Sequence, residues 1–341
     1  MNANNVFVIA EMSGNHNHSL ERALAIVDAA ADSGVHAVKL QTYTPETMTL
    51  DIKTPGFTID DPKSLWFGQN LYELYREAMT PWEWHKPIFE RCQERGIVPF
   101  STPFDSTAVD FLEKLNAPLY KIAAFENGDI PLLKLVAQTR KPVIVSLGML
   151  GIPEIDEVVS TLQNNGSTDI TLLKCTSAYP ASPKDTNLIV IPDLIKRYPG
   201  CKIGLSDHTL GIGVSIGAVA LGAQAIEKHF TLSRADGGVD SAFSMEPHEM
   251  KQLVEETARV SQAIGCVTYQ LSESEIKSQV FRRSIYVVKN IKQGEMFTKE
   301  NIRCIRPGHG LHPRNYETIL GKKAPTDLLK GTSLSNSLLH Q

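Results

Sequence analysis

Hydrophobic residues recur along about the first 245 positions in one pattern, a short β-branched run followed by a polar loop and an amphipathic helix. The apolar runs lie at 6–10, 37–40, 98–100, 119–122, 143–145, 170–173, 203–205 and 225–226. Helical patterns lie between them at 20–31, 82–95, 108–115, 132–139, 155–164 and 214–220. Nearly continuous apolar strands that alternate with helices predict a parallel sheet covered on both faces. Eight such units predict a (β/α)8 barrel of the TIM type.

The main alternative to a barrel is a doubly wound sheet, but no GxGxxG follows the first strand. The connection 41–81 is unusually long, and it contains Pro55, Gly56, Trp66 and Phe67. Long loops after barrel strands usually shape the substrate site. We therefore expect this segment to cover the barrel mouth.

The pattern changes after a long helical stretch at 247–264. A polar stretch follows, and then short apolar runs separated by glycine turns, which are typical of a small β-rich domain. We therefore expect a catalytic barrel over 1–268, a linker over 269–281 and a small domain over 282–341.

Composition narrows the possible partners. The net charge is −4, the two signs are interspersed, and no basic tract favours nucleic acid. No apolar run is long enough to span a membrane. The polar beginning lacks the features of a signal peptide, so we expect a cytoplasmic protein. The five cysteines form no CxxC pair and are expected to be reduced thiols.

Polar residues cluster where the predicted strands end, which is where barrel enzymes place their chemistry. Lys39 and Lys121 lie inside apolar strands, and a buried ammonium group is costly unless it meets an anion. Together with the hydroxyls of Thr102, Ser146 and Ser206, they predict a floor that binds phosphate or carboxylate. Two alternatives stay open: ion pairs with Glu11 or Glu126, and a Schiff-base lysine at Lys121 or Lys174.

His208 and His229 follow adjacent strands, so a closed barrel places them side by side. Two neutral imidazoles suit a divalent transition metal with positions left open for substrate and water. The alternatives for each histidine are a phosphate donor and a general base.

The strand-end motifs, taken together, resemble the sialic acid synthase family. They are IAEMSGNHNH (9–18), KLQTY (39–43), STPFD (101–105), YKIAAFE (120–126), SLGM (146–149), LLKCTSAYP (172–180), GLSDHTLG (204–211) and IEKHFTL (226–232). The late RPGHGL (306–311) is similar to the antifreeze-like, or SAF, domain of that family, and LYELYREAMTPWEW (71–84) is similar to its pseudaminic acid synthases.

The resemblance implies condensation of phosphoenolpyruvate with an acetamido-sugar, 2,4-diacetamido-2,4,6-trideoxy-L-altrose for a pseudaminic acid synthase. It implies that His208 and His229 hold a divalent metal, manganese or magnesium, with cobalt as a further option. Our hypothesis for the mechanism is that the metal or Glu126 activates the attacking water, so we assign catalysis to Glu126 and the two histidines. The implied phosphoenolpyruvate contacts are Lys39, Thr102, Lys121, Ser146, Ser177 and Ser206, and the implied sugar contacts are Glu11, Gln41, Tyr179, Asp240 and Arg306.

Arg306 would come from the other subunit of a domain-swapped homodimer. Two positions depart from the family pattern: Ala124 replaces a frequent serine, and Ser177 replaces a frequent asparagine. Synthases of N-acetylneuraminic or legionaminic acid share the chemistry and stay open as alternatives. More distant alternatives are a Schiff-base aldolase and a non-enzymatic sugar- or ice-binding protein.

Overall fold

Eight parallel strands close into a barrel in the first part of the chain, in the order β1 to β8 with β8 paired to β1. The structure is a computed structural model that describes residues 6–339. The strands are β1 (Phe7–Glu11), β2 (Ala37–Thr42), β3 (Val98–Pro103), β4 (Tyr120–Ile122), β5 (Val143–Ser146), β6 (Ile170–Cys175), β7 (Lys202–Ser206) and β8 (Ala225–His229). The predicted barrel is confirmed, and each predicted apolar run contributes one strand.

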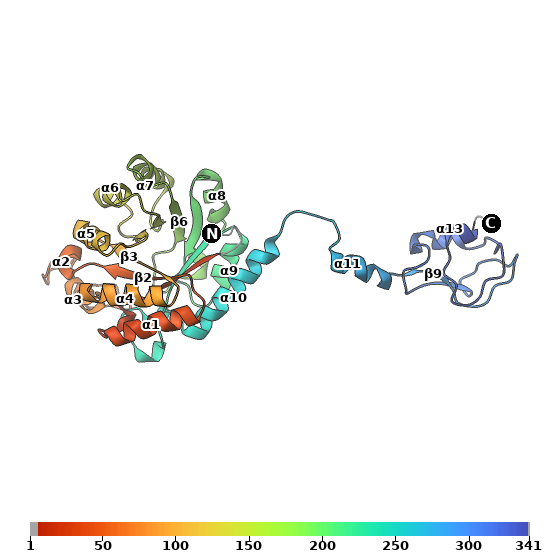
Figure 1. The fold of residues 1–341 in the computed structure, drawn as a ribbon, viewed down its shortest axis with the longest axis horizontal. Helices are drawn as coiled ribbons and strands as arrows, with labels where there is room; N and C mark the ends of the chain where they lie inside the picture. Colours follow the sequence, from red (N-terminus) through yellow and green to blue (C-terminus); the bar gives the residue numbers. More distant parts are fainter. Residues whose placement is uncertain (1–5, 340–341) are drawn as a thin grey trace. The chain divides into compact units, whose positions relative to one another are not determined.

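Helices form a ring around these strands (Figure 1). They are α1 (Leu20–Asp32), α2 (Pro45–Met48), α3 (Leu71–Ala78), α4 (Trp82–Glu94), α5 (Ser106–Lys114), α6 (Ile130–Gln138), α7 (Ile152–Asn164), α8 (Val190–Arg197), α9 (Gly213–Ala220) and α10 (Pro247–Ile264). Polar residues that end strands start some of them: Asp105 after β3 accepts the Thr107 N–H at 2.6 Å and caps α5. No helix within residues 6–339 is long and apolar enough to cross a membrane.

The main apolar core lies between the strands and the helix ring, where residues such as Val8, Ile26 and Leu172 are fully buried. A smaller core fills the inside of the barrel with Ile9, Ala37, Phe100, Ile144, Leu173 and Ala225. These interior residues lie below the carboxyl ends of the strands, so polar side chains can occupy the inner face above them.

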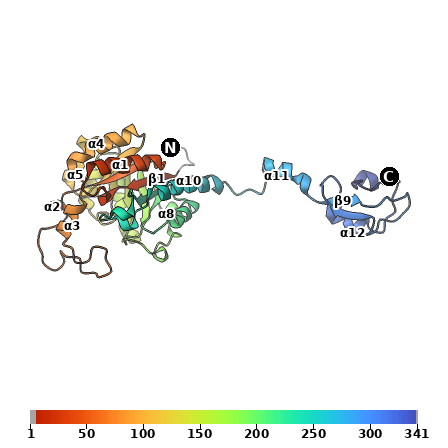
Figure 2. The same ribbon diagram turned by 90° about the horizontal axis from the view of Figure 1, so that it is seen from below.

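The long connection after β2 contains two short helices, α2 and α3, with a loop between them that projects from the barrel (Figure 2). Backbone hydrogen bonds order this loop: Ile59 N donates to Gln69 O at 2.9 Å, and Leu71 N donates to Phe57 O at 2.9 Å. The loop therefore folds back on itself as a hairpin-like excursion.

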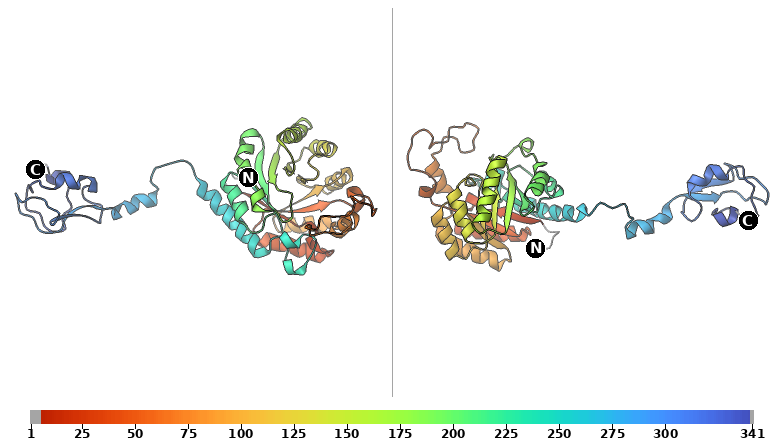
Figure 3. Two further views of the ribbon diagram at one scale, coloured as in Figure 1. Left: turned by 180° about the vertical axis from the view of Figure 1, so that it is seen from behind. Right: turned by 90° about the horizontal axis from the view of Figure 1, so that it is seen from above.

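The chain divides into two compact units, 1–265 and 266–341. The second unit, blue in Figure 3, contains α11 (Glu273–Ser278), β9 (Ser284–Val287), β10 (Ile302–Ile305), α12 (Tyr316–Ile319) and α13 (Asn336–Leu339). Strand β9 pairs antiparallel with β10 in the register Val287 to Ile302. A separate core that includes Ile285, Phe297 and Leu334 holds the unit together.

Candidate active site

A cavity of about 310 Å³ lies at the carboxyl ends of the barrel strands. Its lining brings together most of the residues that the sequence singled out: Glu11, Lys39, Gln41, Lys121, Glu126, Ser146, Tyr179, Ser206, His208, His229 and Asp240. The strand register explains this, because Glu11 on β1 is paired with Lys39 on one side and with His229 on the other. The predicted site residues Thr102 and Ser177 of the barrel unit do not line this cavity.

Two buried lysines and two buried carboxylates form its floor. Lys39 Nζ lies 2.8 Å from Glu11 Oε2 and 3.7 Å from Glu227 Oε2, while Lys121 Nζ lies 3.5 Å from Glu227 Oε1. Burial alone would raise the pKa of Glu227, but Lys121 and Lys39 lower it. Burial lowers the pKa of Lys121. The ion pair that the sequence left open as an alternative is therefore present between Lys39 and Glu11. Lys121 pairs with Glu227 and not with Glu126.

Hydroxyl groups complete this floor. Lys121 Nζ donates to Ser146 Oγ at 2.8 Å, Lys39 Nζ donates to Thr102 Oγ1 at 3.4 Å, and Ser206 Oγ donates to Glu227 Oε1 at 3.0 Å. Thr102 thus reaches the site through Lys39. Lys174, the other candidate Schiff-base lysine, donates to the Cys175 carbonyl at 3.0 Å and does not line the cavity.

The two departures from the family pattern are neighbours in space. A Cβ added to Gly148 would lie only 2.9 Å from Ala124 Cβ and would collide with Ser177 Oγ. Ser177 lies next to Cys175, with 3.8 Å between the oxygen and the sulfur. Ala124, Gly148 and Ser177 therefore form one tightly packed wall beside the floor.

Glu126 follows β4 and carries a strongly perturbed carboxyl group. Burial raises the pKa of Glu126 to about 7, although Lys121 opposes the shift. Its Oε2 is buried and has no hydrogen-bond partner within residues 6–339. A carboxyl group that titrates near neutral pH and has a free buried oxygen can exchange a proton with a bound substrate.

His208 and His229 lie beside each other, with ring centroids 5.4 Å apart. His208 Nδ1 lies 3.0 Å from the Thr176 carbonyl, so it can donate there and leave Nε2 free as a ligand atom. His229 Nδ1 is buried and has no hydrogen-bond partner in the described part of the chain. Burial lowers the pKa of both histidines, which keeps the imidazoles neutral as metal binding requires.

These two rings fit a divalent cation, because neutral imidazoles are good ligands and one ring nitrogen is otherwise an unsatisfied buried polar atom. Residues 6–339 contain no group of three or more His, Cys, Asp or Glu side chains arranged to hold a metal. The protein would therefore supply two ligands, and substrate and water would supply the rest.

Polar groups beyond the floor line the outer part of the cavity. Gln41 Nε2 donates to Glu11 Oε1 at 2.9 Å and to Ser13 Oγ at 3.0 Å, and Ser13 Oγ donates to Asp240 Oδ2. Burial raises the pKa of Asp240, and the hydrogen bond from Ser13 opposes that shift. The Tyr179 ring packs against the His208 ring in a tilted arrangement, with 4.4 Å between the centroids. Hydrogen-bonding groups thus lie beside the histidine pair.

Arg306 belongs to the second unit, where it borders a hollow of about 370 Å³ with Arg282, Arg283 and His312. Its side chain is exposed and has no acidic partner among residues 6–339. The guanidinium group is therefore available to an external anion.

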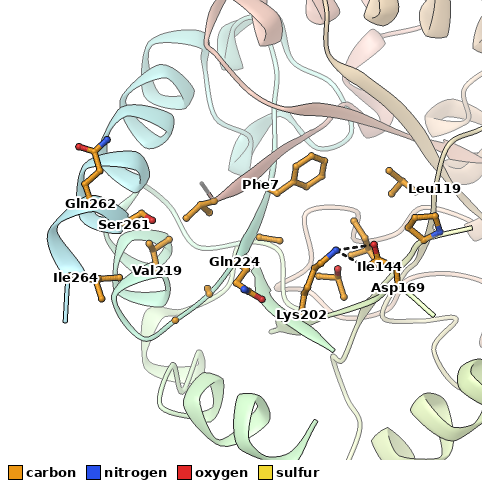
Figure 4. A pocket seen from close by; sticks show the side chains of 17 residues that line it. Phe7, Leu119, Ile144, Asp169, Lys202, Val219, Gln224, Ser261, Gln262 and Ile264 are labelled. Carbon is orange, nitrogen blue, oxygen red and sulfur yellow. Dashed lines mark hydrogen bonds and ion pairs between the residues drawn. The ribbon is translucent and has the colours of Figure 1, made fainter. Parts of the chain in front are cut away.

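A second hollow of the barrel unit, about 630 Å³, lies at the amino-terminal ends of the strands (Figure 4). Apolar side chains such as Phe7 and Ile144 line it, and Lys202 pairs with Asp169 at 2.7 Å. Chemistry in barrels of this type occurs at the opposite end. The smaller hollow with the converging charges is therefore the candidate active site.

Sequence reasoning did not assign a role to Glu227, Ser13 or Trp66. Glu227 touches both floor lysines, and its signal was available, because alternate residues of a strand share a face and Glu227 lies two positions before His229. Ser13 begins a short 3-10 helix after β1 and Trp66 lies in a loop, and strand periodicity applies to neither.

The chain is similar to known proteins over nearly its whole length. Residues 26–269 match the model of the NeuB family, and residues 282–339 match that of the SAF domain. A pseudaminic acid synthase of Campylobacter jejuni is 42% identical over 97% of this chain and 96% of its own. A pseudaminic acid synthase of Helicobacter pylori is 44% identical over 96% of each chain.

Other relatives are more distant. An N,N'-diacetyllegionaminic acid synthase of Campylobacter jejuni is 38% identical over 93% of this chain and 95% of its own. The crystal structure of an N-acetylneuraminic acid synthetase of Leptospira borgpetersenii, in complex with citrate, has a TM-score of 0.71 and 34% identity and covers 81% of this chain and 90% of that one.

Proposed function

The chain belongs to the NeuB family, and we propose that it is a pseudaminic acid synthase that condenses phosphoenolpyruvate with 2,4-diacetamido-2,4,6-trideoxy-L-altrose and releases phosphate. One observation carries this proposal: pseudaminic acid synthases match almost the whole chain at 42–44% identity, against 38% for a legionaminic acid synthase. The converging lysines, hydroxyls and histidines of the barrel mouth are the groups that such a reaction needs.

Lys39, Lys121, Ser146 and Ser206 would bind the phosphate and carboxylate groups of phosphoenolpyruvate, because ammonium and hydroxyl groups donate strong hydrogen bonds to anions. Thr102 would orient Lys39. Ser177, which packs against Gly148, would donate a hydrogen bond to phosphoenolpyruvate only if the bound anion reached it. Since Glu11 and Glu227 already face the two lysines, the floor carries little net positive charge of its own.

The charge balance of this floor supports a divalent cation at His208 and His229, for which we propose manganese or magnesium. Such an ion adds positive charge beside an anionic substrate, and when bound it polarises the sugar aldehyde as a Lewis acid. Glu11, Gln41, Tyr179 and Asp240 would orient the sugar through its hydroxyl and amide groups. We further propose that Arg306 reaches the sugar from a second subunit of a domain-swapped homodimer.

The reaction follows from these positions. C3 of phosphoenolpyruvate forms a bond to the aldehyde carbon, the aldehyde oxygen takes a proton from solvent, and C2 becomes electron-poor. Water then adds to C2 and loses one proton to Glu126, whose pKa of about 7 suits a base at neutral pH. The tetrahedral intermediate expels phosphate with its bridging oxygen, the remaining C2 hydroxyl proton passes to the departing phosphate, and a ketone is left at C2. Glu126 then returns its proton to solvent. The floor lysines stabilise the phosphate as it leaves.

A cytoplasmic location is part of the proposal. Phosphoenolpyruvate is a cytoplasmic metabolite, and all five cysteines have free thiols. Such thiols are typical of proteins in a reducing compartment.

Phosphate release from phosphoenolpyruvate with a panel of acceptor sugars tests the proposal. The largest kcat/KM is expected for the altrose derivative, and faster use of N-acetylmannosamine or of the legionaminic acid precursor would overturn it. In oxygen-18 water the label should enter the sugar product, and labelled phosphate would exclude the C–O cleavage described above.

A further inference from the structure

The lining of the active-site cavity contains two chemically different groups of side chains. The charged floor and the histidines are polar, whereas the connection 41–81, beside Gln41, contributes several apolar side chains to the same lining. We define this methyl wall as Met48, Ile59, Trp66, Leu71 and Leu74, all of which line the cavity. The charged residues between them, such as Asp60 and Lys63, are exposed and do not line it.

Trp66 is the residue that connects the methyl wall to the reacting side. Its indole Nε1–H donates to the Val239 carbonyl at 3.0 Å, next to the sugar-site residue Asp240. Its ring centroid lies 6.1 Å from that of Tyr179, which packs against His208. Its neighbours Leu65 and Phe67 are 48% and 57% exposed, so this loop turns Trp66 inward while both flanking side chains face solvent.

A group of apolar side chains in a polar catalytic cavity is unexpected for an ordinary hexose, because hydroxyl groups pressed against it would lose their hydrogen bonds with water. It suits a sugar that carries several methyl groups. The proposed acceptor has three, one at C6 and one on each acetamido group, while N-acetylmannosamine has one and carries hydroxyl groups at C4 and C6.

We propose that Trp66 and the methyl wall select the acceptor by contacting the methyl groups of a deoxygenated, doubly acetamido-substituted sugar. This inference rests on the proposed function and adds the residues that set its specificity. Contact with one apolar group in a pocket discriminates by about 10–200-fold. Several such contacts lie on one segment here, so removing one lowers the selectivity and leaves the reaction itself in place.

Trp66→Ala tests the wall directly. We expect kcat/KM for the altrose derivative to fall about 10–200-fold, the KM for phosphoenolpyruvate to stay within about twofold, and kcat/KM for N-acetylmannosamine to fall much less. The ratio of kcat/KM for the altrose derivative to that for N-acetylmannosamine should therefore fall, by up to about 200-fold. Phe67→Ala is the matched control, because Phe67 is the next residue, is exposed and does not line the cavity.

Two further variants separate the contacts of the methyl wall from the hydrogen bond that holds Trp66 in place. Ile59→Thr places a hydroxyl on the wall and leaves the backbone hydrogen bonds of the loop intact, so it should also reduce the ratio. Trp66→Phe keeps an apolar ring but removes the donor to Val239, so it should keep most of the selectivity.

The outcomes are distinguishable. A wild-type enzyme that turns over no doubly acetamido-substituted sugar would overturn the proposed function and this inference with it. A wild-type enzyme that prefers this sugar, together with Trp66→Ala and Ile59→Thr variants of unchanged selectivity, would overturn this inference alone.

Discussion

Replacing Lys228 with methionine should destabilise the barrel strongly, because the variant leaves a buried carboxylate without its counter-charge. The side chains of Lys228 and Asp207 are 1% and 0% exposed, and Lys228 Nζ lies 3.0 Å from Asp207 Oδ2. The same ammonium group donates to the carbonyls of Thr209 at 2.6 Å and Gly211 at 3.0 Å. The pair thus joins the ends of β7 and β8, immediately before His208 and His229.

The size of the effect follows from what remains after the substitution. Breaking a buried ion pair by removing one partner costs about 3–5 kcal/mol. Asp207 keeps three donors, the Thr209 N–H, the Thr209 hydroxyl and the Ser215 hydroxyl, which favours the lower end of that range. A loss of about 3 kcal/mol lowers the melting temperature of a unit of this size by roughly 6–10 °C.

Thermal and urea unfolding of the barrel measure the loss, and Lys202→Met is the matched control. Lys202 pairs with Asp169 at 2.7 Å, but the two side chains are 42% and 41% exposed. Exposed pairs contribute about 0–1 kcal/mol, so the control should stay near the wild type. Calorimetric titration with manganese should also show weaker binding to Lys228→Met. Equal stability of the two variants would refute the reasoning.

Four more predictions test the site and the barrel that carries it. The kcat/KM should rise with pH through about 7 as Glu126 ionises, and a pH-independent wild-type rate would contradict its role as a base. Glu126→Gln should lower kcat about 100-fold or more. Because that pKa is raised on folding, the carboxyl should reduce stability as pH rises from about 4.5 to 7, and urea titrations of Glu126→Gln should lack this slope. His229→Ala should fold normally but bind manganese more weakly in calorimetric titration, and unchanged affinity would contradict the metal assignment. Gly204→Ala should cost about 1–3 kcal/mol in urea unfolding, since its Cβ would lie 2.7 Å from Leu173 Cδ2 and closer still to Ala225 O; a neutral effect would refute the packing argument.

The fold and most of the site could be predicted from the sequence because both follow from short-range patterns. In the sequence, a barrel strand is recognised as a run of apolar residues, and the strand ends where polar residues begin. Closure of the barrel then brings every strand end to one rim, so Lys39 on β2 and Lys121 on β4 meet although they are far apart in the chain. No knowledge of loop conformation is needed for that step.

No comparable sequence rule predicts the conformation of a loop. The position of Trp66 depends on a hydrogen bond to Val239, 173 residues later, and on the hairpin-like fold of its own loop. The sequence predicts that the connection 41–81 covers the mouth, but it does not say which of its aromatic residues turns inward. Exposed Phe67 and inward Trp66 are adjacent, and composition alone does not distinguish them.

Strand periodicity also distinguishes the strand-end residues that face outward from those that face the cavity, which residue types alone do not do. The strand-end sequences SDH (206–208) and EKH (227–229) each place a charged residue between two that face the cavity. Since alternate side chains point to opposite faces, Asp207 and Lys228 lie on the outer face, where each neutralises the other. Ser206 and Glu227 face inward with the histidines and contact the floor. The ion pair between Asp207 and Lys228 therefore fixes the two strand ends on the outer face of the barrel, and the residues on the inner face can contact substrate.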